Sequence, residues 1–455
     1  MTPEPVTPES VTPESVTPES VTPESVTPES VTPESVTPES VTPESVTPES
    51  VFTGLKVLDA SSFIAGPAAA TVLSDFGADV IKIEPPGTGD PQRRLSSVPP
   101  SPQAEANYGW HLANRNKRGM VLDLKSPAAV EVLKRLVQWA DVVITNFPHG
   151  TREKLHLGYE EVTGWNPRVV YADLTGFGDA GPDARQPGFD LTAFWSRSGL
   201  LASTRDAGAP PTVPVWGSGD YTTAIAVYAA ITTALYHRER TGQGANVGTS
   251  LLATGVWATG TLVAGALAHG TPFELHDRKA PANPLINPYQ TADGEWFMLV
   301  ASPTRWPGLT RAVGHPELLE DPRFADLEGM VRHAGALAEL LDTEFRSQTF
   351  DHWRDALSRE RITYSLIQTP EAAARDQQLR DNDIVVPLAG VSGLTETVSS
   401  PVTLRGVPKV PAKRAPDLGE HNDEILAELG FGPAEIDALH AGGAVPGTPP
   451  QEPPH

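Results

Sequence analysis

The chain has 455 residues, with 34 Lys and Arg against 57 Asp and Glu and a formal net charge of −23 at pH 7. So acidic a chain lacks the basic face that binding to nucleic-acid phosphates requires, and we expect no nucleic-acid partner. It contains no cysteine, which excludes disulfides, a thiolate nucleophile and cysteine-ligated metals.

The N-terminal segment is a repeat. Residues 6–50 are nine copies of VTPES that follow the degenerate start TPEP. Proline in every copy prevents a continuous helix or strand ladder, and the repeat has too few apolar residues to form a core. We therefore expect residues 1–51 to be a disordered acidic tail. The chain shows no pattern of a signal peptide or a membrane span, so we expect a cytoplasmic protein without a membrane partner.

Strand and helix patterns alternate after residue 54. β-rich runs occupy residues 55–61, 79–84, 119–125, 141–147 and 168–178. Helical patterns fill residues 66–78 and 127–140, where Ser126 is the expected N-cap, with a shorter one at 151–165. Repeated strand–helix–strand units predict a parallel α/β sheet that helices cover on both faces.

The second half of the chain has a different pattern. Residues 284–375 begin with an expected hairpin around Asp293 and Gly294 and continue as helices, which predicts a smaller α+β domain. Two helices are expected at 421–430 and 432–442. We expect residues 52–250 to form the first part of a large α/β domain, followed by a linker at 251–280 and the small domain at 281–375. Residues 376–442 are then expected to form a return linker and C-terminal helices that complete the large domain. A loose Pro-rich tail is expected at 443–455.

Several common catalytic motifs are missing from the sequence. The first strand–helix turn has no G-x-G-x-x-G, and the chain contains no phosphate-binding G-x-x-x-x-G-K-[ST], no G-x-S-x-G and no H-E-x-x-H. These absences disfavour NAD and ATP enzymes, serine hydrolases and zinc enzymes. We expect no metal site and no permanently bound cofactor.

The stretch VWGSGDYTTAIAVYAAITTAL, residues 214–234, places Asp220 between a Gly-Ser-Gly turn and a long apolar run. Aspartate is a preferred N-cap, so Asp220 is a candidate cap of the helix that follows. A helix N-terminus also favours a negative charge, and glycines allow a ligand to approach closely, so the same position is compatible with a reactive carboxylate, although position alone favours the cap. The local pattern leaves both readings open.

Six blocks, at residues 54–94, 114–125, 140–150, 166–182, 219–244 and 415–431, resemble the class III coenzyme A transferases, the family of formyl-CoA transferase, carnitine CoA-transferase and α-methylacyl-CoA racemase. The blocks follow the family's order, and the resemblance spans residues 52–442. It implies a Rossmann-like large domain with a smaller α+β domain. It also implies a homodimer in which the two chains interlock like rings.

The resemblance assigns the chemistry to Asp220. It implies that this carboxylate attacks the thioester of an acyl-CoA donor, and that an aspartyl anhydride and an aspartyl-CoA thioester then carry CoA to a carboxylic acid acceptor. The expected activity is therefore that of an acyl-CoA:carboxylate CoA-transferase, with the coenzyme A thioester as a substrate. Gly219 and Asp190 are expected to support the nucleophile.

The resemblance also implies a CoA-binding set. By alignment of the blocks its members are Phe63, Ile64, Ala65, Leu122, Lys125, Asn146, Phe147, Pro148, Arg115, Arg118 and Lys154. The basic cluster formed by Arg115, Lys117 and Arg118 is unusual in so acidic a chain and suggests recognition of phosphate. Pro85 stands where some transferases have an arginine, which puts one CoA contact in doubt.

Two alternatives to the transferase remain. An acyl-CoA racemase or intramolecular CoA isomerase would need a second base, but Phe189 stands where the racemases have a histidine. A family member without catalysis is the other alternative, which an intact Asp220 disfavours. Five aromatic residues are expected near the site and are typical either of a core or of a pocket for an aromatic or branched acid: Phe189, Phe194, Trp195, Trp216 and Tyr221.

Overall fold

The computed structural model describes residues 50–446, so residues 1–49 of the expected disordered tail and residues 447–455 of the Pro-rich C-terminal tail lie outside the described residues. A six-stranded sheet has the order β3-β2-β1-β4-β5-β6, and every neighbouring pair is parallel. Its strands are β1 (Lys56–Ala60), β2 (Asp79–Glu84), β3 (Arg118–Val121), β4 (Val142–Thr145), β5 (Val170–Thr175) and β6 (Ala245–Ser250). The predicted parallel α/β sheet is confirmed, and β6 extends it beyond the predicted strands.

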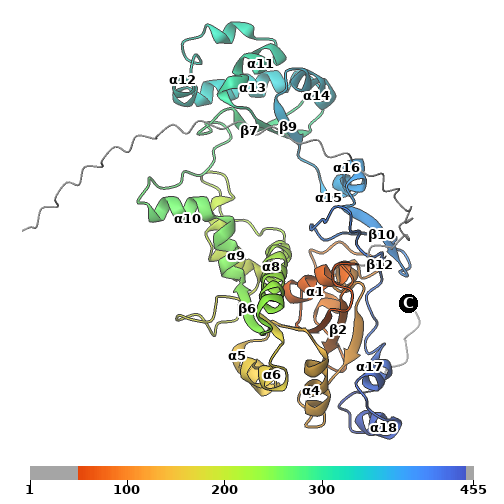
Figure 1. Cartoon of the computed structure of the whole chain (residues 1–455). Helices are drawn as coiled ribbons and strands as arrows, with labels where there is room; N and C mark the ends of the chain where they lie inside the picture. The colour runs from red at the N-terminus through yellow and green to blue at the C-terminus, as the bar shows by residue number, and fades with distance from the viewer. Residues whose placement is uncertain (1–49, 447–455) are drawn as a thin grey trace, which may run out of the picture. The chain divides into compact units, whose positions relative to one another are not determined.

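Helices cover both faces of this sheet. Helices α1 (Ala65–Asp75) and α8 (Ser218–Thr241) lie side by side on one face (Figure 1). The other face is covered by α4 (Ala129–Trp139), α6 (Tyr159–Trp165), α17 (Asn422–Glu428) and α18 (Pro433–Ala441). Successive strand residues point to opposite faces, so Val57 joins the first core and Leu58 the second. Both faces are buried, which explains why most residues of the central strands β1 and β4 are apolar.

A third hydrophobic core surrounds an antiparallel sheet of order β7-β8-β9, with β7 (Ile286–Gln290), β8 (Trp296–Val300) and β9 (Thr363–Leu366). Its helical elements are η2 (Pro303–Arg305), α11 (Trp306–Ala312), η3 (Pro316–Leu319), α12 (Leu327–Arg332), α13 (Ala334–Phe345) and α14 (Phe350–Arg359). Asp293 and Gly294 form the predicted hairpin turn, in which Gly294 has a φ of +85°. The pattern did not indicate β9, since this strand pairs with β8 only after the intervening helices.

The segments expected as linkers contain regular structure. The stretch after β6 forms α9 (Leu251–Ala258) and α10 (Gly260–Leu267). The return segment contains α15 (Pro370–Ala373), α16 (Gln377–Asp381) and a small sheet in which β10 (Val385–Ala389) lies between β11 (Glu396–Val398) and β12 (Ala412–Lys413). Among residues 50–446, no helix has the length and apolar character needed to cross a membrane.

The predicted N-cap of the helix at 127–140 was wrong. Helix α4 begins at Ala129 with Ala128 at the N-cap, and no side chain caps it. The N–H of Ala129 donates to the backbone oxygen of Ser126 at 3.0 Å. A backbone turn therefore separates Ser126 from the first helical residue.

Four charged side chains are buried beneath the carboxyl ends of β1 and β2. Lys117 Nζ lies 2.8 Å from Asp59 Oδ2, and Lys82 Nζ lies 2.9 Å from Asp90 Oδ2 and 3.9 Å from Asp59 Oδ2. Burial by itself raises the pKa of Asp59, but the two ammonium groups outweigh it and hold the pKa below its usual value. Lys82 also donates to the backbone oxygen of Ser61 at 2.9 Å, so the network reaches the loop after β1.

Replacing Asp59 with Asn is expected to lower the free energy of unfolding by about 3–5 kcal/mol, because it removes one partner of a buried charge network. Urea unfolding followed by circular dichroism measures this change. The matched control is Glu131→Gln, which removes a solvent-exposed pair with Arg135 (N···O 3.0 Å) and should cost less than about 1 kcal/mol. Equal losses in the two variants would contradict this account of the buried network.

Candidate active site

A cavity of about 880 Å³ opens at the carboxyl ends of the sheet strands. Segments that follow β1, β2, β3, β4 and β5 line it, together with the helix η1 (Asp190–Ser196) and the start of α8. The strand order reverses direction between β1 and β4, and open parallel sheets bind ligands in the crevice that such a reversal creates. The cavity is therefore where the fold predicts a substrate site.

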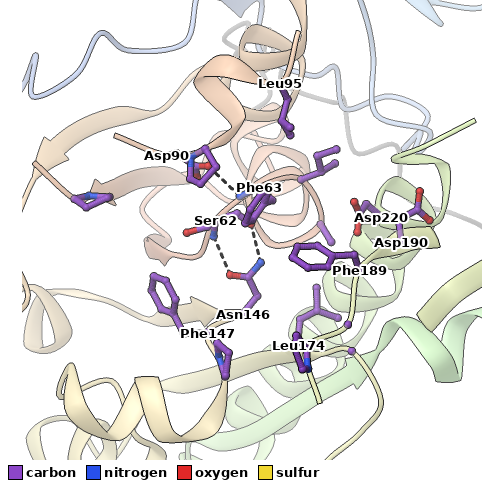
Figure 2. A pocket seen from close by; sticks show the side chains of 18 of the residues that line it. Ser62, Phe63, Asp90, Leu95, Asn146, Phe147, Leu174, Phe189, Asp190 and Asp220 are labelled. Atoms are coloured by element: carbon purple, nitrogen blue, oxygen red, sulfur yellow. Dashed lines mark hydrogen bonds between the residues drawn. The ribbon is translucent and has the colours of Figure 1, made fainter. Parts of the chain in front are cut away.

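The loop after β1 forms one wall of the cavity in a fixed shape. Phe63 has a φ of +65°, a left-handed backbone that strains a bulky side chain. Asp90 Oδ1 accepts the Phe63 N–H at 3.0 Å, and the amide of Asn146 pairs with both backbone groups of Ser62, at 2.8 Å and 2.7 Å (Figure 2). These hydrogen bonds hold the strained loop in place. Asp90 thereby connects the buried charge network to the cavity.

Asp220 is not the N-cap of its helix, which corrects one of the two open readings. Helix α8 begins at Ser218, its N-cap is Gly217 with a φ of +80°, and Asp220 is the third residue of the first turn. The first amides are instead satisfied by Asp190, which accepts the Gly217 N–H with Oδ2 and the Gly219 N–H with Oδ1, the latter at 3.1 Å. Asp190 thus caps α8 from another element and leaves the Asp220 carboxylate free to line the cavity.

Gly219 lies beneath the site and does not line the cavity. A Cβ atom at this position would lie 2.2 Å from Asp190 Oδ1 and 2.4 Å from Phe194 Cγ. Only glycine allows the start of α8 to approach η1 so closely. The glycine of the Gly-Asp pair therefore has a structural reason.

Two carboxylates lie side by side at this end of the cavity, as Figure 2 shows for Asp190 and Asp220. Burial, with a smaller contribution from the negative charge of Asp190, raises the pKa of Asp220 to about 7. Burial also raises the pKa of Asp190, and the hydrogen bonds from Gly217 and Gly219 oppose that shift. A partly desolvated carboxylate that ionises near neutral pH is a competent nucleophile or base.

Most of the predicted CoA-binding residues come together at the cavity. Its lining includes Phe63, Ile64, Ala65, Leu122, Lys125, Asn146, Phe147 and Pro148, together with Asp190 and Asp220. Leu122 and Lys125 follow β3, and the residues from Asn146 to Pro148 follow β4. Lys125 and Arg94 are the cationic side chains among the described residues that line it.

Three members of the predicted CoA-binding set do not line the cavity, and acidic neighbours bind two of them. Buried Arg115 donates to both oxygens of Asp75, at 2.8 Å and 2.7 Å. Arg118 is paired with Asp79 at 2.6 Å and with two glutamates of α17. Lys154 is exposed at the end of α5 (His149–Lys154) and does not line the cavity. In the same basic cluster, Lys117 belongs to the buried charge network. The cluster is therefore structural.

The remaining lining residues include several that were not assigned to the site. Leu174 lies near the end of β5, Gly176 follows that strand, and Leu251 follows β6. The end of the predicted strand at 168–178 signals the first two, whereas Leu251 follows a strand that the sequence did not indicate. Of the five aromatic residues expected near the site, Phe189 and Trp216 line the cavity.

Among residues 50–446, no group of three or more His, Cys, Asp or Glu is arranged to hold a metal ion.

Comparison with known proteins agrees with this architecture. The model of CoA-transferase family III matches residues 52–422. The (R)-2-hydroxy-4-methylpentanoate CoA-transferase of Clostridioides difficile is 32% identical over 388 residues, which cover 84% of this chain and 96% of that protein. The cinnamoyl-CoA:phenyllactate CoA-transferase of Clostridium sporogenes is 31% identical over 399 residues, which cover 86% of this chain and 96% of the relative.

A solved structure shows the same fold. The crystal structure of a CAIB/BAIF family protein from Brucella suis superposes with a TM-score of 0.75 at 28% sequence identity, covering 84% of this chain and 100% of the other. The family model covers the six-stranded sheet, the cavity lining and Asp220 together. The chain therefore belongs to CoA-transferase family III and is an enzyme that transfers coenzyme A.

Proposed function

We propose that this enzyme is an acyl-CoA:carboxylate CoA-transferase in which Asp220 is the nucleophile. The observation that carries the proposal is the position of Asp220, whose carboxylate lines the cavity at the carboxyl ends of the strands with a pKa raised to about 7. Asp190 acts as a positioning residue, because it fixes the backbone on both sides of Ser218 without using the Asp220 carboxylate.

The proposed reaction has four acyl-transfer steps, and each carbonyl attack expels one leaving group. The Asp220 carboxylate attacks the donor thioester and expels CoA thiolate, which forms a mixed anhydride. The thiolate attacks the aspartyl carbonyl and releases the donor acid, leaving an aspartyl-CoA thioester. The acceptor carboxylate attacks this thioester, expels the thiolate and forms a second anhydride. The thiolate then attacks the acceptor's acyl carbonyl, which releases the new acyl-CoA and restores Asp220.

The lining supports a direction for bound CoA. Lys125 follows β3 and Arg94 lies on α2 (Gln92–Leu95), which follows β2, so both cations belong to the side of the crevice opposite β5 and β6. We place the CoA phosphates on that side and the thioester beside Asp220. Pro85, the position that lacks an arginine, lines the same cavity as Arg94, and Arg94 is our candidate for the missing cationic contact.

The site supports transfer better than racemisation. Moving a proton at an α-carbon requires two bases on opposite faces of the substrate. Phe189 lines the cavity at the position of the racemase histidine, and the Asp190 carboxylate is occupied by two backbone N–H groups. We therefore retain racemase or intramolecular isomerase activity only as the alternative.

Asp220→Asn is expected to lower CoA transfer by roughly 10³-fold or more, because the amide is not a nucleophile and no other carboxylate replaces it. The measurement is mass spectrometry of the thioesters formed from a panel of acyl-CoA donors and carboxylic acids. Asp437→Asn, a change at an exposed position on α18, is the matched control and should retain full activity. Turnover by a folded Asp220→Asn variant would refute the nucleophile assignment.

The activity is expected to depend on the ionisation of Asp220. The carboxylate is the attacking form, so it is present above a pKa of about 7 and is lost as the pH falls through that value. We therefore expect kcat/KM to fall about tenfold per pH unit on the acid side of neutrality. Initial rates between pH 5 and pH 9, with donors that do not titrate in this range, measure the profile. A flat profile from pH 5.5 to pH 8 would contradict the assignment.

We also propose that the enzyme is a homodimer of interlocked chains. Large apolar side chains on two helices support an association surface, with Trp257 on α9 86% exposed and Leu267 on α10 76% exposed. Interlocked chains cannot separate without unfolding, so the dimer should persist on dilution to nanomolar concentration, unlike a dimer governed by mass action. Light scattering and single-molecule mass measurement test this, and a diluted monomer with native circular dichroism would contradict it.

A further inference from the structure

The end of the cavity beside Asp220 is lined by apolar side chains that come from separate elements. They are Ile64, Leu174, Phe189, Leu191, Trp216 and Leu251. Ile64 reaches the start of α8, since a Cβ atom on Gly217 would lie 3.1 Å from its Cδ1. Leu251 packs in one cluster with Ala193 and Phe194 of η1. The walls that this chain supplies at the end of the cavity beside Asp220 are therefore apolar.

No cation of the described lining belongs to this end. Arg94 and Lys125 follow β2 and β3, and neither strand neighbours β5 or β6 in the sheet. Three strand spacings separate β2 from β5, roughly 14 Å at the usual spacing. A second carboxylate on the acyl group would therefore lie unpaired among apolar side chains and close to Asp190, which opposes its binding.

The backbone around Phe189 is fixed at this end of the cavity. Its ring packs edge to face against Phe63, with centroids 5.7 Å apart, and 57% of Phe189 is exposed (Figure 2). The residues on both sides are fixed. A Cβ atom on Gly188 would lie 2.6 Å from the Cα of Gly176, and Asp190 is bound to the start of α8. An exposed ring on a fixed backbone is a preformed apolar contact for a substrate.

We propose that this end of the cavity selects monocarboxylic acyl groups with a bulky apolar side chain over dicarboxylic ones, and that Phe189 sets the preference. The proposal rests on the proposed function, because it takes Asp220 as the point to which the acyl carbonyl is delivered. Phe189 acts through contact with the acyl side chain, and it takes no part in bond making.

The first test measures exchange of an isotope-labelled acid into its own CoA thioester, which avoids the choice of a donor. The probes are 3-phenylpropionate with 3-phenylpropionyl-CoA, glutarate with glutaryl-CoA, and acetate with acetyl-CoA. We expect kcat/KM for the phenylpropionyl pair to exceed that for the glutaryl pair by roughly 100-fold or more, since the site leaves the second carboxylate unpaired. Equal or faster glutaryl exchange would overturn the proposal.

Variants of Phe189 test its role. Phe189→Ala should lower the ratio of phenylpropionyl to acetyl exchange about tenfold, whereas Phe189→Leu, which keeps most of the apolar contact, should preserve most of it. Circular dichroism checks that both variants are folded. A loss of the same size for all three acids would indicate a structural role for the ring and would overturn its assignment to specificity.

A binding measurement separates this proposal from the proposed function. The Asp220→Asn variant should bind 3-phenylpropionyl-CoA at least about tenfold more tightly than glutaryl-CoA in isothermal titration, since the CoA portion is common to both. If this preference holds but the wild type exchanges no acid, the proposed function fails and the selectivity stands. If the wild type exchanges acids but glutaryl-CoA binds as tightly, the selectivity fails alone.

Discussion

The position of the Asp220 carboxylate in the cavity depends on the carboxylate of Asp190. By accepting the N–H groups of Gly217 and Gly219, it joins η1 to the first turn of α8 and satisfies amides that a helix would otherwise leave unpaired. Because a different element supplies this cap, the Asp220 carboxylate does not have to bind the first amides of α8. The close approach requires glycine at position 219, because any Cβ atom would collide with Asp190 and Phe194. The nucleophile of the proposed reaction is thus placed by hydrogen bonds in which it takes no part.

The sheet distributes the chemical roles along the cavity. Its order places the segments after β3 and β2 on one side and those after β5 and β6 on the other. The loop after β1 lies between them, fixed by Asn146 and by Asp90, which a buried lysine holds in turn. A rigid central wall with cations on one side suits a long substrate whose phosphates and thioester must lie far apart.

The sequence predicted the parts of the fold that local pattern determines, and it failed where long-range contacts decide. β-rich runs at β1, β2 and β4 identified buried parallel strands, whereas β6 has only Ala245 and Val247 as apolar residues and joins the sheet through pairing with β5. The loop residues from Phe63 to Ala65 and from Asn146 to Pro148 were found through the resemblance. Arg115 and Arg118 were misplaced, because no local signal shows that Asp75 and Asp79 already bind them.

The proposed reactivity and selectivity share one physical cause, the partial burial of Asp220 in a part of the cavity to which the described lining brings no cation. The same burial that raises its pKa to about 7 weakens the hydration of the carboxylate and makes it a better nucleophile. A second substrate carboxylate in this space would add to the charge of Asp190, raise the pKa further and keep Asp220 protonated at neutral pH. A dicarboxylic acyl group would therefore bind poorly and would also keep Asp220 in its protonated, unreactive form. An apolar acyl group in contact with Phe189 would displace water from this end of the cavity and add no charge, so the Asp220 carboxylate would stay ionisable near neutral pH. The proposed substrate would thus preserve the ionised carboxylate that attacks it.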